Sequence, residues 1–353
     1  MRKRLKGVLA SRAAGPADPA ETPLAGDWPL AEPFEIGGVA MPNRVVQAPL
    51  AGIANWAFRR QSRRHGAGLC VSEMVASYGV HHGNRKTLAM LRVLPDEAPV
   101  AIQLFGADAA VMVEAARAAE AAGADLIDVN MGCPVRKITK TGAGAALLDD
   151  PDAAARIVEA MAGAVDVPVM AKMRRGTTPS SSRPVAVAQR LEAAGAAALC
   201  VHPRAAAEEY SGAADHAITA QVAAAVSIPV IASGDIITPA DALRVVDEAG
   251  AAAVAIGRGA LGAPWAFGEI ATGRPRSRPE PAEVVAEIER FAADVVAALG
   301  PARAVGYMRR FYPWYLAGLP VEGEALQSMQ VESTLDGALE ILRRSCLEAP
   351  VPA

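Results

Sequence analysis

The sequence lacks several features that mark particular classes of protein. Its four cysteines (Cys70, Cys133, Cys200 and Cys346) are scattered and form no Cys-x-x-Cys pair, which argues against a metal site or a disulfide framework. No apolar run reaches the roughly 18 to 20 residues needed to cross a bilayer, so no membrane contact is expected. Residues 1–6 are basic, but no apolar signal-peptide core follows them. We therefore expect a cytoplasmic protein.

An excess of positive charge is also missing. The chain has 35 Lys and Arg against 38 Asp and Glu, a net charge of −3 and a pI near 6.0. This balance gives no global signal for nucleic-acid binding, so any RNA contact must come from a local patch. With 353 residues, 52% of them hydrophobic, the chain can bury a large core. We expect it to act as a monomer.

What is present is a rhythm of apolar, strand-like runs separated by alanine-rich segments of helical period. Eight strands with helical connections over roughly 230 residues match a (β/α)8 barrel in count and size. A doubly wound sheet is the alternative, but it would need a Gly-x-Gly-x-x-Gly turn where residues 48–52 are Ala-Pro-Leu-Ala-Gly. We expect strands at 45–49, 69–73, 100–105, 124–130, 167–173, 197–202, 230–234 and 252–257, and helices at 56–65, 109–122, 152–164, 184–194, 216–225 and 239–248.

The pattern predicts an α/β fold, a TIM barrel over residues 31–273, followed by a small all-helical domain. Residues 1–30 have few large apolar groups and are predicted to form a disordered tail. A hairpin with a Gly-Gly turn is expected at 34–41, closing the bottom of the barrel. Residues 274–281 form a proline-rich linker. The helical domain, residues 282–353, has helix-like segments at 282–299, 302–316 and 334–346.

One stretch combines a strand end with reactive side chains, Asp128-Val-Asn-Met-Gly-Cys-Pro134. The apolar run before it has the length of a buried parallel strand, so Asn130 and Cys133 would lie past its C-terminal end, where barrel enzymes keep their chemistry. Asn130 offers both a donor and an acceptor, and Cys133 carries an acidic S–H. A lone cysteine is more often a buried small hydrophobic residue than a catalyst. Here two polar groups and two nearby glycines favour a site over a core.

Polar residues end the other predicted strands as well. Lys172 would be buried unless it faces a polar cavity or an anion. Gln103, taken alone, is equally compatible with a hydrogen-bonded core amide, and a lone histidine such as His202 is more often a hydrogen-bonded core residue than a ligand. Their recurrence at the same end of successive strands favours one shared site. The strand-end residues are Pro49, Glu73, Gln103, Asn130 with Cys133, Lys172, His202 with Arg204, Ser233-Gly-Asp235 and Gly257-Arg258.

The last two strand ends predict a phosphate site. Gly234 and Gly257 lack a β-carbon, so backbone N–H groups can approach an anion there, and Arg258 adds a bidentate donor. Ordinary glycine turns with a surface arginine are the alternative. Loops after strands seven and eight commonly bind phosphate in such barrels. Together with the amides and the lysine of the earlier strand ends, this site indicates bound FMN.

These residues resemble the tRNA-dihydrouridine synthase (Dus) family, in its DusB-like branch. The match spans residues 43–267, and its most specific part is Asn130-Met-Gly-Cys-Pro134, followed in order by Lys172-Met-Arg and His202-Pro-Arg. Family members combine an FMN-binding barrel with a C-terminal helical domain that helps to hold tRNA. Further matching stretches are Ala48-Pro-Leu-Ala-Gly52, Ser72-Glu-Met-Val75, Gln103-Leu-Phe-Gly106, Gly142-Ala-Gly-Ala-Ala-Leu147, Tyr210-Ser-Gly212, Ile231-Ala-Ser-Gly-Asp235, Ile256-Gly-Arg258 and Pro264-Trp265.

The resemblance implies the chemistry of the site. NADPH would reduce the FMN, a hydride would pass to C6 of a uracil flipped out of tRNA, and Cys133 would protonate C5. A thiol with a pKa of about 8.5 is mostly protonated at neutral pH yet acidic enough to donate. The expected cofactor-binding residues are Pro49, Gln103, Asn130, Lys172, His202, Ser233, Gly234, Asp235, Gly257 and Arg258.

Local basic clusters could supply the RNA contacts. Those after the fourth and fifth strands would ring the barrel mouth, where a phosphate backbone should pass. Aromatic residues interleave with arginines over 308–316, as in an RNA-facing helix, although they could equally pack a core. The expected RNA-binding residues are Arg136, Lys137, Lys140, Arg174, Arg175, Arg204, Arg309 and Arg310; further clusters are Arg59-Arg60 with Arg63-Arg64, and Arg85-Lys86.

The sequence thus predicts an FMN-dependent, NADPH-consuming tRNA-dihydrouridine synthase. One alternative is a small-molecule ene-reductase or dihydroorotate dehydrogenase-like enzyme, which would use similar strand-end residues but gain nothing from the helical domain. The other is a non-enzymatic RNA-binding barrel, against which Cys133, Lys172 and His202 argue. The position of the reduced uridine does not follow from the sequence.

Overall fold

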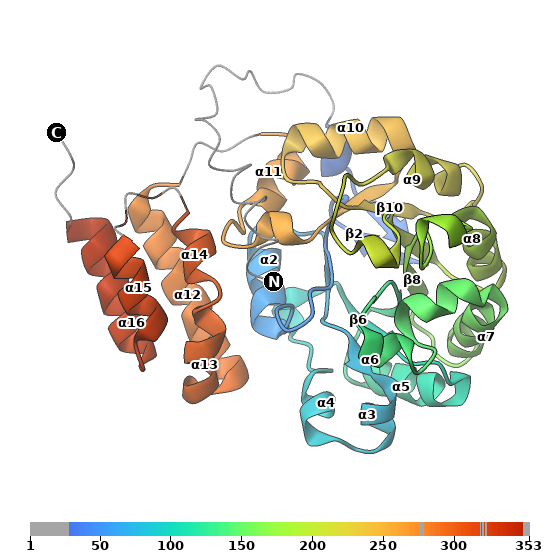
Figure 1. Ribbon diagram of the computed structural model, residues 1–353, viewed down its shortest axis with the longest axis horizontal. Coiled ribbons are helices and arrows are strands. Elements are labelled where there is room, and N and C mark those ends of the chain that lie inside the picture. The colour runs from blue at the N-terminus through green and yellow to red at the C-terminus, as the bar shows by residue number, and fades with distance from the viewer. Residues whose placement is uncertain (1–27, 275–278, 318, 320, 322, 349–353) are drawn as a thin grey trace.

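The computed structural model describes residues 28–274, 279–317, 319, 321 and 323–348. Within them, a closed barrel with helices around it is followed by a group of helices that lies to one side, next to α2 (Trp56–Arg64) (Figure 1). No helix in the described ranges is both long enough and apolar enough to cross a membrane.

Eight parallel strands form the barrel, as predicted. Each pairs with its neighbours in parallel, and the pairing of β4 with β6 closes the ring. A short additional strand, β5 (Val75–Ala76), pairs with the end of β6. The barrel strands are β3 (Val45–Gln47), β4 (Leu69–Val71), β6 (Val100–Phe105), β7 (Leu126–Met131), β8 (Val169–Arg174), β9 (Ala198–His202), β10 (Val230–Ser233) and β11 (Ala253–Ile256).

All six predicted barrel helices are present, and several begin at a side chain that caps the free backbone N–H groups of their first turn. The Asn55 side chain accepts from the N–H groups of Ala57 and Phe58, and Asp108 does the same for α5. Four short helices, α3, α4, α6 and α11, were not predicted because four to seven residues show no helical period. The helices around the barrel are α2, α3 (Ser77–His81), α4 (Arg85–Ala89), α5 (Ala109–Ala121), α6 (Arg136–Thr139), α7 (Pro151–Ala162), α8 (Pro184–Ala193), α9 (His216–Ala223), α10 (Pro239–Ala249) and α11 (Ala266–Thr272).

The barrel interior is apolar at one end and polar at the other. The predicted hairpin, β1 (Phe34–Ile36) and β2 (Val39–Met41), contributes Ile36 and Met41 to the same buried cluster as the inward-facing residues of the early strand positions. Side chains alternate between the two faces of a strand, so the residues two and four positions further along also point inward. Several of these later positions are polar, among them Gln103, Asp128, Lys172 and His202, whereas Ala48, Val71, Cys200 and Ala255 remain apolar. Apolar inward residues include Val46, Leu69, Ala101, Leu126, Met170, Ala198, Ile231 and Ala253.

The predicted N-terminal tail extends slightly too far. Residues 1–27 lie outside the described residues, but Trp28 donates its indole N–H to the carbonyl of Ile270 at 2.7 Å, and Leu30 is completely buried. Residues 28–31 therefore pack against the barrel. The composition of the first thirty residues as a whole is poor in large apolar side chains, and this average concealed Trp28 and Leu30.

The C-terminal helices are α12 (Pro281–Leu299), α13 (Pro301–Met308), α14 (Tyr312–Tyr315), α15 (Gly323–Val331) and α16 (Leu335–Arg343), which continues into a π-helical turn over Arg344–Glu348. The single helix predicted at 302–316 is broken into two, because Pro313 has no N–H to continue the helical ladder. Helix α15 was not predicted. Of the expected linker, residues 275–278 lie outside the described residues.

The basic face of α2 holds the helical domain against the barrel. Arg60 and Arg64 donate to the carboxylate of Asp294 on α12 at 2.7 and 2.6 Å. Gln61 donates to Glu287 and to the hydroxyl of Tyr315, each at 2.6 Å. Arg60 and Arg64 of this charge run therefore contact the C-terminal helices, rather than forming an RNA-binding cluster or a solvated helix face.

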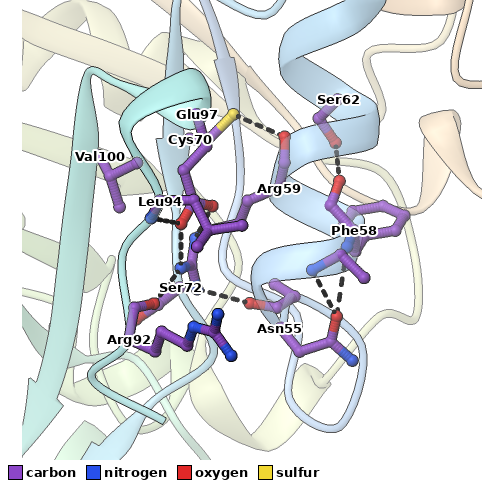
Figure 2. A network of polar contacts seen from close by, with 12 residues as sticks. Asn55, Phe58, Arg59, Ser62, Cys70, Ser72, Arg92, Leu94, Glu97 and Val100 are labelled. Carbon is purple, nitrogen blue, oxygen red and sulfur yellow. Dashed lines mark hydrogen bonds and ion pairs between the residues drawn. The ribbon is translucent and has the colours of Figure 1, made fainter. Parts of the chain in front are cut away.

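Arg59, on the same helix, forms a buried ion pair with Glu97 in the segment before β6. Its guanidinium donates to both carboxylate oxygens at 2.9 Å and to the carbonyl of Arg92 at 2.7 Å, and Glu97 also accepts from the backbone N–H of Leu94 (Figure 2). Burial raises the pKa of Glu97, and the guanidinium opposes that shift. The pair fixes α2 relative to β6 at the closure of the barrel.

Removing one partner of this pair should be costly. We expect Arg59→Met to lower the free energy of unfolding by about 3 to 5 kcal/mol, because the Glu97 carboxylate would stay buried without its partner. Arg190→Met is the control, since it breaks an ion pair with Asp152 in which both side chains are 61% exposed, and should cost at most about 1 kcal/mol. Urea unfolding followed by circular dichroism measures both. Equally small losses would contradict a structural role for the buried pair.

Candidate active site

The C-terminal ends of the barrel strands surround one cavity at the polar end of the barrel. Gln103, Asn130 and Cys133 do not line it but belong to the adjacent β6, β7 and the turn after β7, where Asn130 pairs in register with Lys172. The structure therefore brings the expected strand-end residues to one place. Lining residues are Pro49, Lys172, His202, Ser233, Gly234, Asp235, Gly257 and Arg258, which were expected, and Ala48, Leu50, Tyr210, Ile236, Ile237, Ala255 and Gly259, which were not.

Two glycines leave space that a side chain would fill. A β-carbon on Gly234, whose φ is +121°, would lie 2.9 Å from Cδ2 of His202 and 3.0 Å from the β-carbon of Ala214. A β-carbon on Gly259 would lie 2.8 Å from the carbonyl oxygen of Ile236. Contacts this short are not tolerated, so both turns require glycine. They form part of the cavity wall at the ends of β10 and β11.

Asp235 organises the positive charge at this end of the cavity. Its carboxylate accepts from Nη2 of Arg204 and from the backbone N–H of Ala214, and lies 3.9 Å from the guanidinium of Arg258. Burial alone would raise the pKa of Asp235, but these partners hold it below its ordinary value. The guanidinium of Arg258 also lies 4.2 Å from the ring centre of Tyr210. Arg258 is thus fixed at the cavity wall with part of its charge available to an anion.

His202 is neutral. Nη1 of Arg204 lies 3.2 Å from Nε2 of His202, and because a guanidinium can only donate, Nε2 accepts. Burial lowers the pKa of His202 far below its ordinary value, and the neighbouring charges of Lys172 and three arginines lower it further. Its proton therefore sits on Nδ1, which makes the ring a hydrogen-bond donor.

Lys172 has a cation without a protein partner. It is on β8 in register with Asn130, and its side chain lines the cavity. Within the described part of the chain its ammonium makes no hydrogen bond or ion pair. An ammonium half-buried in this way is stable only if water or a ligand supplies an acceptor. The group is therefore positioned for a ligand with a carbonyl or negatively charged edge.

The turn that carries Cys133 is held from both sides. The side-chain oxygen of Asn130 accepts the backbone N–H groups of Gly132 at 3.2 Å and of Cys133 at 3.0 Å. On the other side, Arg174 donates from Nε to the carbonyl of Gly132 at 3.0 Å. The carbonyl of Cys133 accepts from the N–H of Ala145 at 3.1 Å. The backbone that carries the Cys133 thiol is therefore held in place by hydrogen bonds.

The thiol of Cys133 carries its proton at neutral pH. It is half-buried, and burial raises its pKa above the ordinary value, while the N–H of Val135 and the charge of Arg174 lower it by less. Of the other described cysteines, Cys70 and Cys200 are buried within barrel strands. Cys133 is thus suited to donate a proton rather than to attack as a thiolate.

The residues expected to bind RNA fall into two groups. Arg174 and Arg204 are buried, with 4% and 2% exposed, and hydrogen bonds within the protein occupy them. We no longer assign these two to RNA. Arg175 pairs with Glu208 at 3.2 Å, and Arg309 donates to the carbonyl of Glu332. The exposed group is Arg136, Lys137 and Lys140 on and after α6, while Arg310 is half-buried over the ring of Tyr307 at 4.6 Å.

Two residues of the site were not assigned a role from the sequence. Tyr210 is 45% exposed, and its ring contacts Arg258 and, at 5.7 Å, Arg174. Asp128 is buried next to Gln103. Each lay in a stretch already noted for another residue, and only the three-dimensional contacts distinguish them. Within the described ranges, no group of three His, Cys, Asp or Glu side chains could hold a metal ion.

Comparison with solved structures supports the fold. Histamine dehydrogenase from Rhizobium sp. 4-9 superposes with a TM-score of 0.57 at 16% identity, covering 75% of this chain and 51% of that one. A variant of morphinone reductase superposes with a TM-score of 0.54 at 16% identity, covering 72% of this chain and 93% of its own. At these identities the likeness shows the barrel fold alone.

Sequence comparison shows the family. The probable tRNA-dihydrouridine synthase of Rhodobacter capsulatus is 40% identical over 298 residues, which is 82% of this chain and 92% of the relative. The tRNA-dihydrouridine synthase B of Pseudomonas aeruginosa is 40% identical over 289 residues, which is 81% of this chain and 87% of the relative. The model of the dihydrouridine synthase (Dus) family matches residues 46–349. The chain therefore belongs to the dihydrouridine synthase family.

Proposed function

We propose that this protein reduces the C5=C6 bond of uridine in tRNA, using FMN and NADPH, with Cys133 as the proton donor. The observation that carries the proposal is a protonated thiol, held rigidly beside a cavity with an unpaired lysine and a glycine-lined, arginine-bearing wall. The relatives, named as tRNA-dihydrouridine synthases, support the choice of substrate.

The residues of the cavity fit FMN. The wall formed by Gly234, Gly257 and Arg258 suits a phosphate, because backbone approaches closely and one guanidinium is partly free. Lys172 suits a carbonyl edge of the ring system, and neutral His202 offers an N–H donor. When bound, the flavin would supply hydride transfer, and NADPH would restore it.

Cys133 would complete the reduction by giving its proton to C5 of the base. The residue can do this because burial keeps the thiol protonated and because Asn130 and Arg174 hold its backbone. Proton transfer to carbon requires close placement, which a fixed turn provides. The half-burial of Cys133 also limits access, so that an extruded base is the form of uridine able to reach it.

The exposed cations after β7 are suited to the tRNA backbone. Arg136, Lys137 and Lys140 lie three to seven residues beyond Cys133 and form no ion pair within the described residues. Phosphates neighbouring the extruded nucleotide would pass over α6 and contact them. These contacts carry no base specificity, so they would strengthen binding to any tRNA.

Replacing the proton donor tests the chemistry. In Cys133→Ala, we expect FMN content and NADPH-dependent bleaching of the flavin to stay within twofold of wild type, while reduction of unmodified tRNA falls by about 10² to 10⁴. Dihydrouridine mapping and the rate of flavin reoxidation by tRNA give the two measurements. Free orotate and simple enones serve as competing oxidants. Undiminished turnover on tRNA would remove Cys133 from its proposed role, and preference for orotate or enones would overturn the choice of substrate.

Filling the space at Gly234 tests the cofactor site. In Gly234→Ala, the new β-carbon would meet His202 and Ala214, so we expect the Kd for FMN, measured by quenching of its fluorescence, to rise at least about tenfold. Gly250→Ala is the control. Gly250 also has a positive φ, +60°, but nothing lies within 4 Å of its β-carbon position and it ends α10 outside the site. Equal FMN affinity in both variants would argue against a cofactor at this wall.

Charge removal on α6 tests the RNA interface. We expect the triple variant Arg136→Ala, Lys137→Ala and Lys140→Ala to bind tRNA more weakly and to lower the slope of log Kd against log salt by roughly two to three. FMN binding should not change. Arg156→Ala with Arg190→Ala, exposed on α7 and α8, forms the control and should leave the salt slope unaltered. An unchanged slope in the triple variant would place the tRNA elsewhere.

A further inference from the structure

A chain of side-chain hydrogen bonds runs from the barrel interior to the backbone of Cys133. Gln103 donates from Nε2 to Oδ2 of Asp128 at 2.6 Å. The carbonyl of the same amide accepts from Nδ2 of Asn130 at 2.8 Å. The carbonyl of Asn130 then accepts the N–H groups of Gly132 and Cys133. Three side chains from two adjacent strands thus connect a buried carboxylate with the catalytic turn.

The strand register explains why these side chains meet. Gln103 on β6 pairs in register with Asp128 on β7, and both point into the barrel. Asn130 lies two positions further along β7 and therefore points to the same side, one level closer to the polar end. All three are at least nine-tenths buried. The chain is therefore part of the barrel interior, where bulk water does not compete for its hydrogen bonds.

The direction of every hydrogen bond in this chain is fixed from both ends. While ionised, the Asp128 carboxylate can only accept, so it requires the NH2 group of Gln103 and leaves the Gln103 carbonyl for Asn130. Backbone N–H groups can only donate, so they require the carbonyl of Asn130 and leave its NH2 for Gln103. An amide by itself can face either way. Only Asp128 supplies the fixed end at the interior.

Asp128 is not needed to fill the core. Burial raises its pKa to about 7, and its second oxygen, Oδ1, is buried without a hydrogen-bond partner in the described structure. The charge and backbone N–H of Lys172 favour the ionised form, but Gln103 donates the one side-chain hydrogen bond to this carboxylate. A leucine or asparagine of similar size would avoid burying a carboxylate, so its presence is unfavourable unless these interactions have a use.

We propose that Asp128 is a positioning residue, whose carboxylate fixes the amide orientations of Gln103 and Asn130 and thereby holds the turn that presents the Cys133 thiol. The consequence for catalysis rests on the proposed function, because the positioned group matters as the proton donor to the base. The positioning itself depends only on the protein's own hydrogen bonds and needs neither cofactor nor substrate.

An exchange of donor and acceptor tests the proposal at almost constant size. In Gln103→Glu, two buried carboxyl groups face each other and one of them takes up a proton, so the bond between them no longer has the Gln103 amide as its donor. In the double variant Gln103→Glu with Asp128→Asn, the new amide donates to the new carboxylate, which still accepts from Asn130. The double variant has the same net charge as the wild type and restores the direction of the whole chain. Packing is nearly equal in all of them.

The first readout needs neither cofactor nor tRNA. Iodoacetamide labelling of the FMN-free protein, resolved at Cys133 by peptide mass spectrometry, reports how firmly the turn is held. We expect the labelling rate to rise at least threefold in Gln103→Glu and in Asp128→Leu, and to return to within twofold of wild type in the double variant. Labelling of Cys346, which lies in the C-terminal helices and outside this hydrogen-bond series, is the internal control.

The second readout separates positioning from binding. For tRNA reduction, kcat should fall 10- to 100-fold in Gln103→Glu and Asp128→Leu, with KM for tRNA within twofold, and the double variant should recover to within about threefold of wild type. Asp128→Asn alone can accept from Gln103 but can also face the other way, so its kcat should lie between those of wild type and Asp128→Leu.

The outcomes are distinct. A double variant as impaired as Gln103→Glu in both readouts, or an Asp128→Leu protein with wild-type labelling, would overturn the proposal. Should a Gln103→Glu protein fail to fold, the comparison of Asp128→Leu with Asp128→Asn still decides, since equal labelling of these two contradicts it. A wild-type protein that labels as expected but does not reduce tRNA would instead reject the proposed function.

Discussion

The pairing of β4 with β6 is the interaction on which the site depends. Through it, Cys70 pairs with Val100 and the sheet becomes a ring, so that all strand ends meet at one end of the barrel, where those of β3 and β8 to β11 line the cavity. In an open sheet, Pro49 after β3 and Gln103 on β6 would lie on strands separated by most of its width. Closure also encloses an interior whose side chains are apolar beside the hairpin and polar at the opposite end. The buried ion pair of Arg59 with the segment before β6 stabilises the ring at this point.

Arginine serves this fold mainly as a structural residue. Arg59 joins α2 to the barrel. Arg174 and Arg204 connect the loops after β7 and β9 through backbone carbonyls, and Arg204 also reaches the loop after β10 through the carboxylate of Asp235. A guanidinium has five donors in a fixed plane, so one side chain can satisfy several carbonyls that irregular loops leave unpaired. Lysine could not replace it here. The same property makes arginine common in RNA interfaces, which is why a charge pattern cannot separate the two uses.

Features that depend on neighbouring residues in the sequence could be predicted, and features that depend on contacts between distant segments could not. The eight strands were predictable because alternation and apolar runs are local signals. Much of the cavity lining was predictable because the strand ends of a closed barrel must converge. Trp28 and the helix break at Pro313 depend on single residues that an averaged pattern conceals. The burial of Arg174 and Arg204 depends on carbonyls from distant loops. The role proposed for Asp128 depends on Gln103, which only the strand register places beside it.

Charge balance connects the parts of the site. Around the cavity, Lys172, Arg258 and the two buried arginines oppose the carboxylate of Asp235 and the partly protonated Asp128. Burial, reinforced by this excess of positive charge, keeps His202 neutral. The same charge would favour a thiolate at Cys133, yet the pKa of the thiol is raised because its burial outweighs the charge of the nearby guanidinium. That guanidinium is held on carbonyl oxygens of the surrounding loops. The excess charge therefore remains for an anion at the glycine-lined wall, while the proton stays on sulfur.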